Sequence, residues 1–139
     1  MKIHLYFIGK ARDAHANALA ADYLGRISHY AAVHSSEIRP EKVDLFARHP
    51  SARKVFLDPA GRSMDSEAFA GMIGQTEMAG QELLFLVGGA DGLPREWRDR
   101  ADLLLSLSRM TFPHELARAM LAEQIYRAFA ILRGHPYPR

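Results

Sequence analysis

Gly88 and Gly89 directly follow an uninterrupted apolar run over residues 83–87. Such a run predicts a strand buried on both faces of a parallel sheet. Ligands of open α/β sheets bind beyond the carboxyl ends of the strands, and glycine lets a ligand approach the backbone closely. The two glycines therefore indicate either a ligand site or a tight turn. Ala90 stands where the pattern GxGxxG, started at Gly88, requires its second glycine, and the pattern GxxxxGK does not occur in the chain. The sequence therefore supports neither a nicotinamide site nor an ATP site.

The seven histidines are scattered, and none forms a closely spaced pair of metal ligands. His114 and Glu115 open the zinc-protease pattern HExxH, but Arg118 occupies the position of the second histidine. The absence of cysteine excludes disulfides, thiolate nucleophiles and cysteine-bound metals. No serine lies in a GxSxG pattern. The sequence therefore predicts neither a metal site nor a hydrolase triad.

The carboxyl-terminal part of the chain is basic. Five arginines stand against two glutamates from Arg109 onward, although the whole chain has a net charge of only +2. His135, Tyr137 and Arg139 lie in a tail that contains two prolines, and such side chains can stack on bases and contact phosphates. The alternative for this tail is a frayed terminus. Residues 107–113 likewise form either a plain connection between a strand and a helix or part of a site.

Strands and helices alternate along the chain, which predicts an α/β fold: a mostly parallel sheet with helices on both faces. Short apolar runs predict strands at residues 3–8, 54–57, 83–87 and 103–107. Helical patterns cover residues 11–30, about 69–79 and 113–132, with a short helix after Pro94. Pro94 and Pro113 are expected inside the first turns of their helices, and Asp58, Pro59 and Gly61 are expected to stop the second strand. Residues 34–52 predict only a short strand near 36–38 and a helical turn near 43–47.

The chain length of 139 residues and the hydrophobic content of 48% predict one compact domain, residues 1–139. The apolar run at the amino terminus ends at Gly9, which is too short to span a bilayer. We therefore expect a soluble, cytoplasmic protein without a membrane segment.

The helix at residues 113–132 is apolar around almost its whole circumference. One side carries Ala117, Leu121, Ile125, Ala128 and Leu132, and another carries Leu116, Met120 and Ile131. A helix of this kind is buried on more than one side. The pattern favours a homodimer in which a second copy covers one side; the alternative is a helix packed between the sheet and the first helix.

Four motifs in this order resemble the ribosomal RNA large subunit methyltransferase H family. They are FLVGGADGL at residues 85–93, LSL at 105–107 with MTFPH at 110–114, AEQIYRA at 122–128 and GHPY at 134–137. The resemblance implies a SPOUT-class α/β methyltransferase with a carboxyl-terminal trefoil knot and a homodimeric assembly. The implied reaction transfers a methyl group from S-adenosylmethionine to ring nitrogen 3 of a pseudouridine in large-subunit (23S) rRNA on the assembled ribosome.

The resemblance also implies roles for individual residues. The family's cofactor contacts fall on Leu57, Gly88, Leu107, Ser108, Arg109, Met110, Thr111 and Phe112. The candidates for substrate contact or catalysis are His114, Arg118, Glu123, Arg127, His135, Tyr137 and Arg139. Since Glu123 and Arg127 are four residues apart on one predicted helix, a structural ion pair is the alternative for these two.

Two departures from the family's pattern concern the RNA-facing parts. Pro138 stands where the family usually has a second histidine, and the segment between Glu37 and Val55 is shorter than usual. A ribosome-binding protein without turnover is therefore one alternative function. A related methyltransferase acting on tRNA is another.

Overall fold

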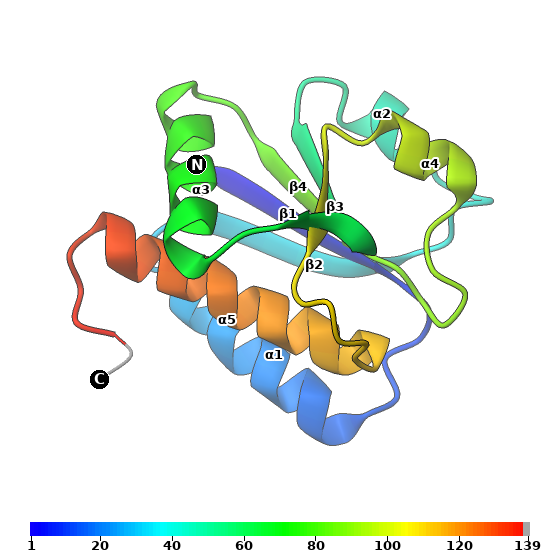
Figure 1. Ribbon diagram of the computed structural model, residues 1–139, viewed down its shortest axis with the longest axis horizontal. Helices are drawn as coiled ribbons and strands as arrows, with labels where there is room; N and C mark the ends of the chain where they lie inside the picture. Colours follow the sequence, from blue (N-terminus) through cyan, green and yellow to red (C-terminus); the bar gives the residue numbers. More distant parts are fainter. Residues whose placement is uncertain (138–139) are drawn as a thin grey trace.

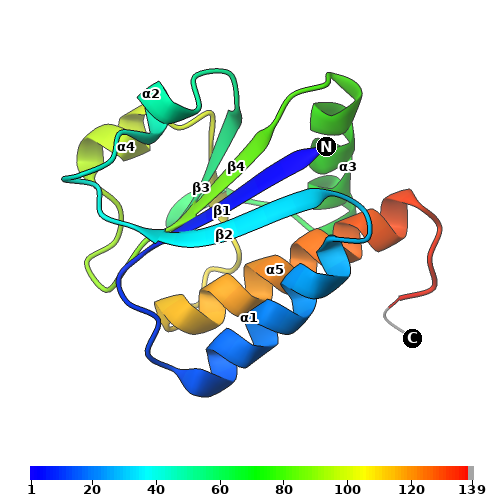
Figure 2. The same cartoon turned by 180° about the vertical axis from the view of Figure 1, so that it is seen from behind.

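The sheet is five-stranded and entirely parallel, with the strand order β2-β1-β4-β3-β5 (Figures 1 and 2). A computed structural model describes residues 1–137 of the chain. Its strands are β1 (Lys2–Ile8), β2 (Ala32–Ile38), β3 (Arg53–Ser63), β4 (Leu83–Val87) and β5 (Leu103–Ser106). The predicted α/β class with a mostly parallel sheet is confirmed.

Helices cover both faces of the sheet, as the alternating pattern predicts. They are α1 (Ala14–Ile27), α2 (Leu45–Arg48), α3 (Ser66–Met78), α4 (Arg95–Arg100) and α5 (His114–Leu132). Figure 1 shows α1, α3 and α5 over one face, with α2 and α4 over the other. Aspartates cap the first three helices by accepting backbone N–H groups, which are otherwise unpaired at a helix start: Asp13, Asp44 and Asp65.

The central strand β4 supplies side chains to two separate hydrophobic cores. Leu83, Phe85 and Val87 pack into the core below α1, α3 and α5. Leu84 and Leu86 point to the opposite face and pack with residues of α2 and α4. Because side chains alternate across a strand, a strand buried on both faces must be apolar at every position.

The expected end of β3 at Asp58 is wrong, because this strand continues to Ser63. Its register against β5 shifts between Leu57 and Arg62, so the intervening residues form a bulge, where proline is tolerated. Gly61 also fits this position, because a β-carbon there would lie 2.6 Å from the backbone carbonyl group of Leu104. The turn residues therefore mark an irregular strand.

Other element boundaries differ by a few residues. Pro94 and Pro113 precede their helices as N-caps with extended backbone, so each helix begins one residue later than expected. The first helix is shorter than residues 11–30 and β5 ends at Ser106. The edge strand β2 extends beyond the predicted residues 36–38; most of its side chains are exposed, which explains its weak apolar pattern. In residues 1–137 no helix is long and apolar enough to cross a membrane.

Helix α5 packs against other elements of the same chain, and it also exposes some of its apolar side chains. Leu121, Ile125 and Phe129 belong to the core shared with α1, α3 and the sheet. Leu116 and Ile131 remain 40% and 42% exposed. The chain itself therefore covers one apolar side of α5 and leaves part of another side open.

Candidate functional site

A cavity of about 390 Å³ lies at the carboxyl ends of β4 and β5, beside the start of the bulge in β3. All strands are parallel, so the loops that follow them gather at one edge of the sheet. The cavity has the size of a small-molecule site and the position at which α/β sheets bind ligands. Its lining is mainly apolar, as such sites generally are.

Seven of the eight residues expected to contact a cofactor line this cavity. They are Leu57, Gly88, Leu107, Ser108, Met110, Thr111 and Phe112. The exception is Arg109, which is exposed and does not line the cavity. Three segments far apart in the sequence thus meet here because β3 lies between β4 and β5.

The glycine loop after β4 is a tight turn that also forms one wall of the cavity. A β-carbon on Gly88 would lie 2.9 Å from the backbone carbonyl carbon of Gly92, and one on Gly89 would lie 3.0 Å from the carbonyl oxygen of Ile8. Gly92 has a φ of +77°, which side chains disfavour. The glycines are therefore needed for the turn itself, and the two interpretations of this loop are compatible.

The loop before α5 is shaped by the hydroxyl groups of two serines. The Ser106 hydroxyl donates to the backbone oxygen of Ser108 at 2.8 Å. The Ser108 hydroxyl in turn accepts from the backbone N–H of Met110 at 3.0 Å. Met110 is 73% exposed although it lines the cavity, so the loop has an outer side that faces solvent.

Asp58 lines the cavity as well, although its place in the sequence predicted only the end of a strand. One carboxylate oxygen lies 2.5 Å from Nε of Arg98 on α4, and the other accepts from the backbone N–H of Ala60 at 2.8 Å. Its position directly after the apolar run Val55–Leu57 was the signal in the sequence that could have indicated this. The ion pair links the cavity to α4.

His114 is the first residue of α5, and its half-buried side chain lines the cavity. The neighbouring Glu115 accepts the backbone N–H of Arg12 at 2.6 Å and that of Asp13 at 3.1 Å. These two hydrogen bonds lower the pKa of Glu115. The same contact ties the start of α5 to the start of α1, which supports the position of His114.

Arg118, a candidate for substrate contact or catalysis, is buried and does not line the cavity. Its guanidinium donates to the side-chain oxygen of Asn17 on α1 and lies 4.1 Å from the centre of the Phe7 ring. Burial lowers the pKa of Arg118. The described geometry is that of a group joining α1, α5 and β1.

Glu123, Arg127 and Tyr137 form a second cluster. The Glu123 carboxylate pairs with Arg127 at 2.6 Å, the structural ion pair that their spacing allows. The Tyr137 hydroxyl donates to Glu123 at 2.6 Å and lies 3.2 Å from the hydroxyl of Tyr23. Burial first, and then Glu123, raise the pKa of Tyr137.

This second cluster does not meet the cavity. Glu123 lies nine positions after His114 on α5, which is about 13.5 Å along the helix axis. His135 is exposed and accepts the backbone N–H of Tyr137 at 3.2 Å. Arg139 lies outside the described residues. The structure therefore groups His114 with the expected cofactor residues and separates Arg118, Glu123, His135 and Tyr137 from them.

A five-stranded parallel sheet with a ligand-sized cavity at its carboxyl edge defines a class, the α/β proteins that bind a small molecule at this edge. Residues 1–138 match the family model described as "Predicted SPOUT methyltransferase". Proteins named "Ribosomal RNA large subunit methyltransferase H" are similar over the whole chain. The one from Solibacter usitatus is 66% identical, with 100% of each chain covered. The one from Cereibacter sphaeroides is 42% identical, covering 100% of this chain and 99% of that protein.

Solved structures support the fold. A probable methylase family protein from Haemophilus influenzae has a TM-score of 0.64 at 10% identity, covering 99% of this chain and 70% of that one. A probable methyltransferase from Bordetella pertussis has a TM-score of 0.57 at 10% identity, covering 91% and 95%. The chain belongs to the ribosomal RNA large subunit methyltransferase H family of SPOUT methyltransferases.

Proposed function

We propose that this chain methylates large-subunit rRNA, using S-adenosylmethionine as the methyl donor. The finer proposal is transfer to ring nitrogen 3 of a pseudouridine on the assembled ribosome, in the cytoplasm, by a single knotted domain. Family membership supports the reaction type, and the names of the relatives support the RNA. The observation that carries the proposal is the cavity at the ends of β4 and β5 and beside the β3 bulge, which gathers seven residues expected to bind the cofactor.

The residues present fit such a cofactor. The cavity combines an apolar wall, which includes Leu57 and Phe112, with backbone made accessible by Gly88. Adenine can be held by backbone groups and apolar side chains of residues 107–112. Bound S-adenosylmethionine would supply a methyl group that its sulfonium charge already activates. The chain's contribution is then to orient the base against this group, and orientation alone can contribute about 7–11 kcal/mol to catalysis.

We assign different roles to His114 and Arg109. His114 lines the cavity at the start of α5 and is the proposed acceptor for the proton that leaves the ring nitrogen. Arg109 is exposed on the outer side of the cavity loop and is proposed to contact an RNA phosphate. We assign Arg118 to structural support, because it is buried against Asn17.

We also propose a homodimer. Leu116 on α5 and Leu19 on α1 are 40% and 43% exposed. Leu19 and Met120 also line a second cavity, to which the start of α3 and the end of β5 contribute. A second copy covering this apolar surface would bury side chains that water otherwise contacts. Because Glu123 also lines this cavity and binds Tyr137, the tail of one protomer would lie near the interface.

The proposal is tested by transferring labelled methyl groups from S-adenosylmethionine to intact ribosomes from cells that lack this protein. Free rRNA and purified tRNA serve as alternative acceptors. The expected result is label confined to large-subunit rRNA of intact ribosomes. Label on tRNA alone would replace rRNA by tRNA as substrate, and absence of label with intact cofactor binding would overturn the enzymatic proposal.

The residue Pro138 favours a second candidate function. In this alternative the chain is a ribosome-binding protein that keeps the cofactor cavity but does not catalyse methyl transfer. Proline offers neither a proton acceptor nor a backbone donor where the family usually has histidine. The variant Pro138→His distinguishes the two functions. A gain from no measurable rate to turnover supports the binding protein, whereas a wild-type rate that the variant leaves unchanged supports the enzyme.

A further inference from the structure

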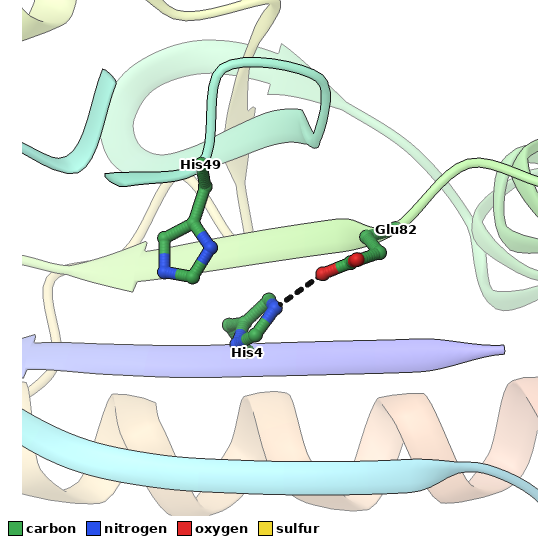
Figure 3. Close-up of side chains that lie close together, drawn as sticks. All are labelled: His4, His49 and Glu82. Atoms are coloured by element: carbon green, nitrogen blue, oxygen red, sulfur yellow. Dashed lines mark hydrogen bonds and ion pairs between the residues drawn. The ribbon is translucent and has the colours of Figure 1, made fainter. Parts of the chain in front are cut away.

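Three side chains that commonly bind metals meet at the amino edge of the sheet, opposite the cavity. His4 lies on β1, Glu82 directly precedes β4, and His49 follows α2. Their candidate ligand atoms all lie within 4.8 Å of one another (Figure 3). β1 and β4 are neighbours with Ile3 opposite Leu83, which brings His4 and Glu82 together, and the segment after α2 adds His49.

The side chains are already oriented toward one another. Nε2 of His4 lies 2.7 Å from a carboxylate oxygen of Glu82, and the rings of His4 and His49 have centres 4.1 Å apart. His4 is buried, while Glu82 is half exposed, so the group lies at the surface with one anchored member. An ion could therefore reach it from solvent.

Tyr6 orients the second histidine. Its hydroxyl lies 2.8 Å from Nε2 of His49, which leaves Nδ1 of that ring for another partner. A metal-bound histidine usually donates its other ring N–H to an oxygen, and this contact fixes the tautomer and the ring plane. The Tyr6 hydroxyl is in place to accept such a bond.

We propose that His4, His49 and Glu82 form a binding site for a divalent transition-metal ion, with Zn²⁺ as the fitting choice. Two imidazoles and one carboxylate suit Zn²⁺, whereas Mg²⁺ and Ca²⁺ prefer oxygen ligands alone. Three protein ligands leave a fourth position for water. The site departs from the expectation of no metal, which rested on spacing along the sequence.

Binding requires a small rearrangement of the three ligand atoms. Ligand atoms of a tetrahedral zinc site lie about 3.4 Å apart, given bonds of about 2.1 Å. His4 and Glu82 must therefore separate slightly from 2.7 Å, and the widest pair must approach from up to 4.8 Å. His49 lies at the end of the short helix α2, outside the strands of the sheet, so it is the ligand expected to shift.

The charges around the three ligands determine how tightly the site is expected to bind a metal ion. One carboxylate does not neutralise a divalent ion, and Lys54 lies nearby, donating to the backbone oxygens of His49 at 2.6 Å and Ala52 at 3.0 Å. Arg48 adjoins His49 in the chain, and Lys2 acts on Glu82. These cations oppose metal binding, so a site of moderate affinity is expected. The ion would connect β1, the start of β4 and the α2 loop.

Equilibrium dialysis of the full chain against zinc chloride, followed by metal analysis, tests the site. The expected result is one zinc ion per chain, with affinity about tenfold or more weaker in His49→Ala and in Glu82→Gln, a loss of about 1.4 kcal/mol. His34→Ala is the matched control: His34 is exposed on β2, with its ring 6.5 Å from that of His4, and is not one of the three ligands.

Thermal unfolding supplies a second measurement that does not depend on methyl transfer. Zinc should raise the melting temperature of the wild type and of His34→Ala but not of Glu82→Gln, because only the folded chain assembles the site. Circular dichroism without zinc checks that each variant folds. Absence of stoichiometric zinc, or equal zinc affinity in all four proteins, would overturn the proposal and leave His4 and Glu82 as a hydrogen-bonded pair.

Discussion

The hydroxyl of Tyr137 donates a 2.6 Å hydrogen bond to the carboxylate of Glu123, which also binds Arg127. This contact docks the start of the carboxyl-terminal tail on α5 of the same chain. The Tyr137 ring also packs edge-on against Tyr126, with centres 4.7 Å apart. Tyr137 is thus held well away from His114, the proposed proton acceptor.

The Tyr137–Glu123 hydrogen bond should be measurable in a double-mutant cycle. Because the acceptor is a partly buried carboxylate, we expect Tyr137→Phe and Glu123→Gln to be coupled by about 1–2 kcal/mol in the free energy of unfolding. Urea denaturation of the wild type, both single variants and the double variant measures this coupling. Strictly additive effects would show that the tail is not held by this bond.

Gly88→Ala should weaken binding of S-adenosylmethionine by about tenfold or more, equivalent to about 1.4 kcal/mol. The added β-carbon would lie 2.9 Å from the backbone of Gly92, so the loop lining the cavity must shift. Calorimetric titration measures the affinity. Gly25→Ala is the control, since its β-carbon meets nothing within 4 Å on the exposed side of α1. It should stabilise the helix by about 1 kcal/mol and leave the affinity unchanged. Normal cofactor affinity in Gly88→Ala would contradict the proposed cofactor site.

Asn17→Ala should lower the free energy of unfolding by about 1–3 kcal/mol, because it leaves the buried guanidinium of Arg118 without its acceptor. Asn17→Asp keeps an acceptor and should retain the stability. Chemical denaturation measures both variants, and cofactor affinity should stay unchanged because Arg118 does not line the cavity. Equal stability of wild type and Asn17→Ala would refute the structural role of Arg118.

Glu115→Gln should alter the dependence of stability on pH. The pKa of Glu115 is lowered in the folded chain, so its contribution is complete above the unfolded value of about 4.3 and is lost as pH falls through the lower folded value. The stability difference between wild type and Glu115→Gln should therefore be largest near neutral pH and shrink as the pH falls below the unfolded value of about 4.3. Denaturation at several pH values measures it, with Glu67→Gln in the first turn of α3 as the control. A difference independent of pH would contradict this assignment.

Much of the fold could be predicted from the sequence, because buried parallel strands and helices have distinct local patterns. The run at 83–87 became β4 with the predicted bounds, and the apolar spacing at 113–132 became α5. Prediction failed where a local signal had two meanings: Asp58 and Pro59 occur in turns, but here they lie in a bulge that only pairing with β5 could specify.

The sequence by itself determined the α/β class, the main helices and the family, since these follow from periodicity and ordered motifs within short stretches of chain. The strand order decided the rest. Only the placing of β3 between β4 and β5 brings Leu57 to Gly88 and the loop before α5. Likewise, only the folded chain buries Arg118 against Asn17 and brings His4 to Glu82, 78 positions away. Contacts between different strands and helices depend on which elements become neighbours in the fold. The spacing of residues along the chain does not specify these neighbours.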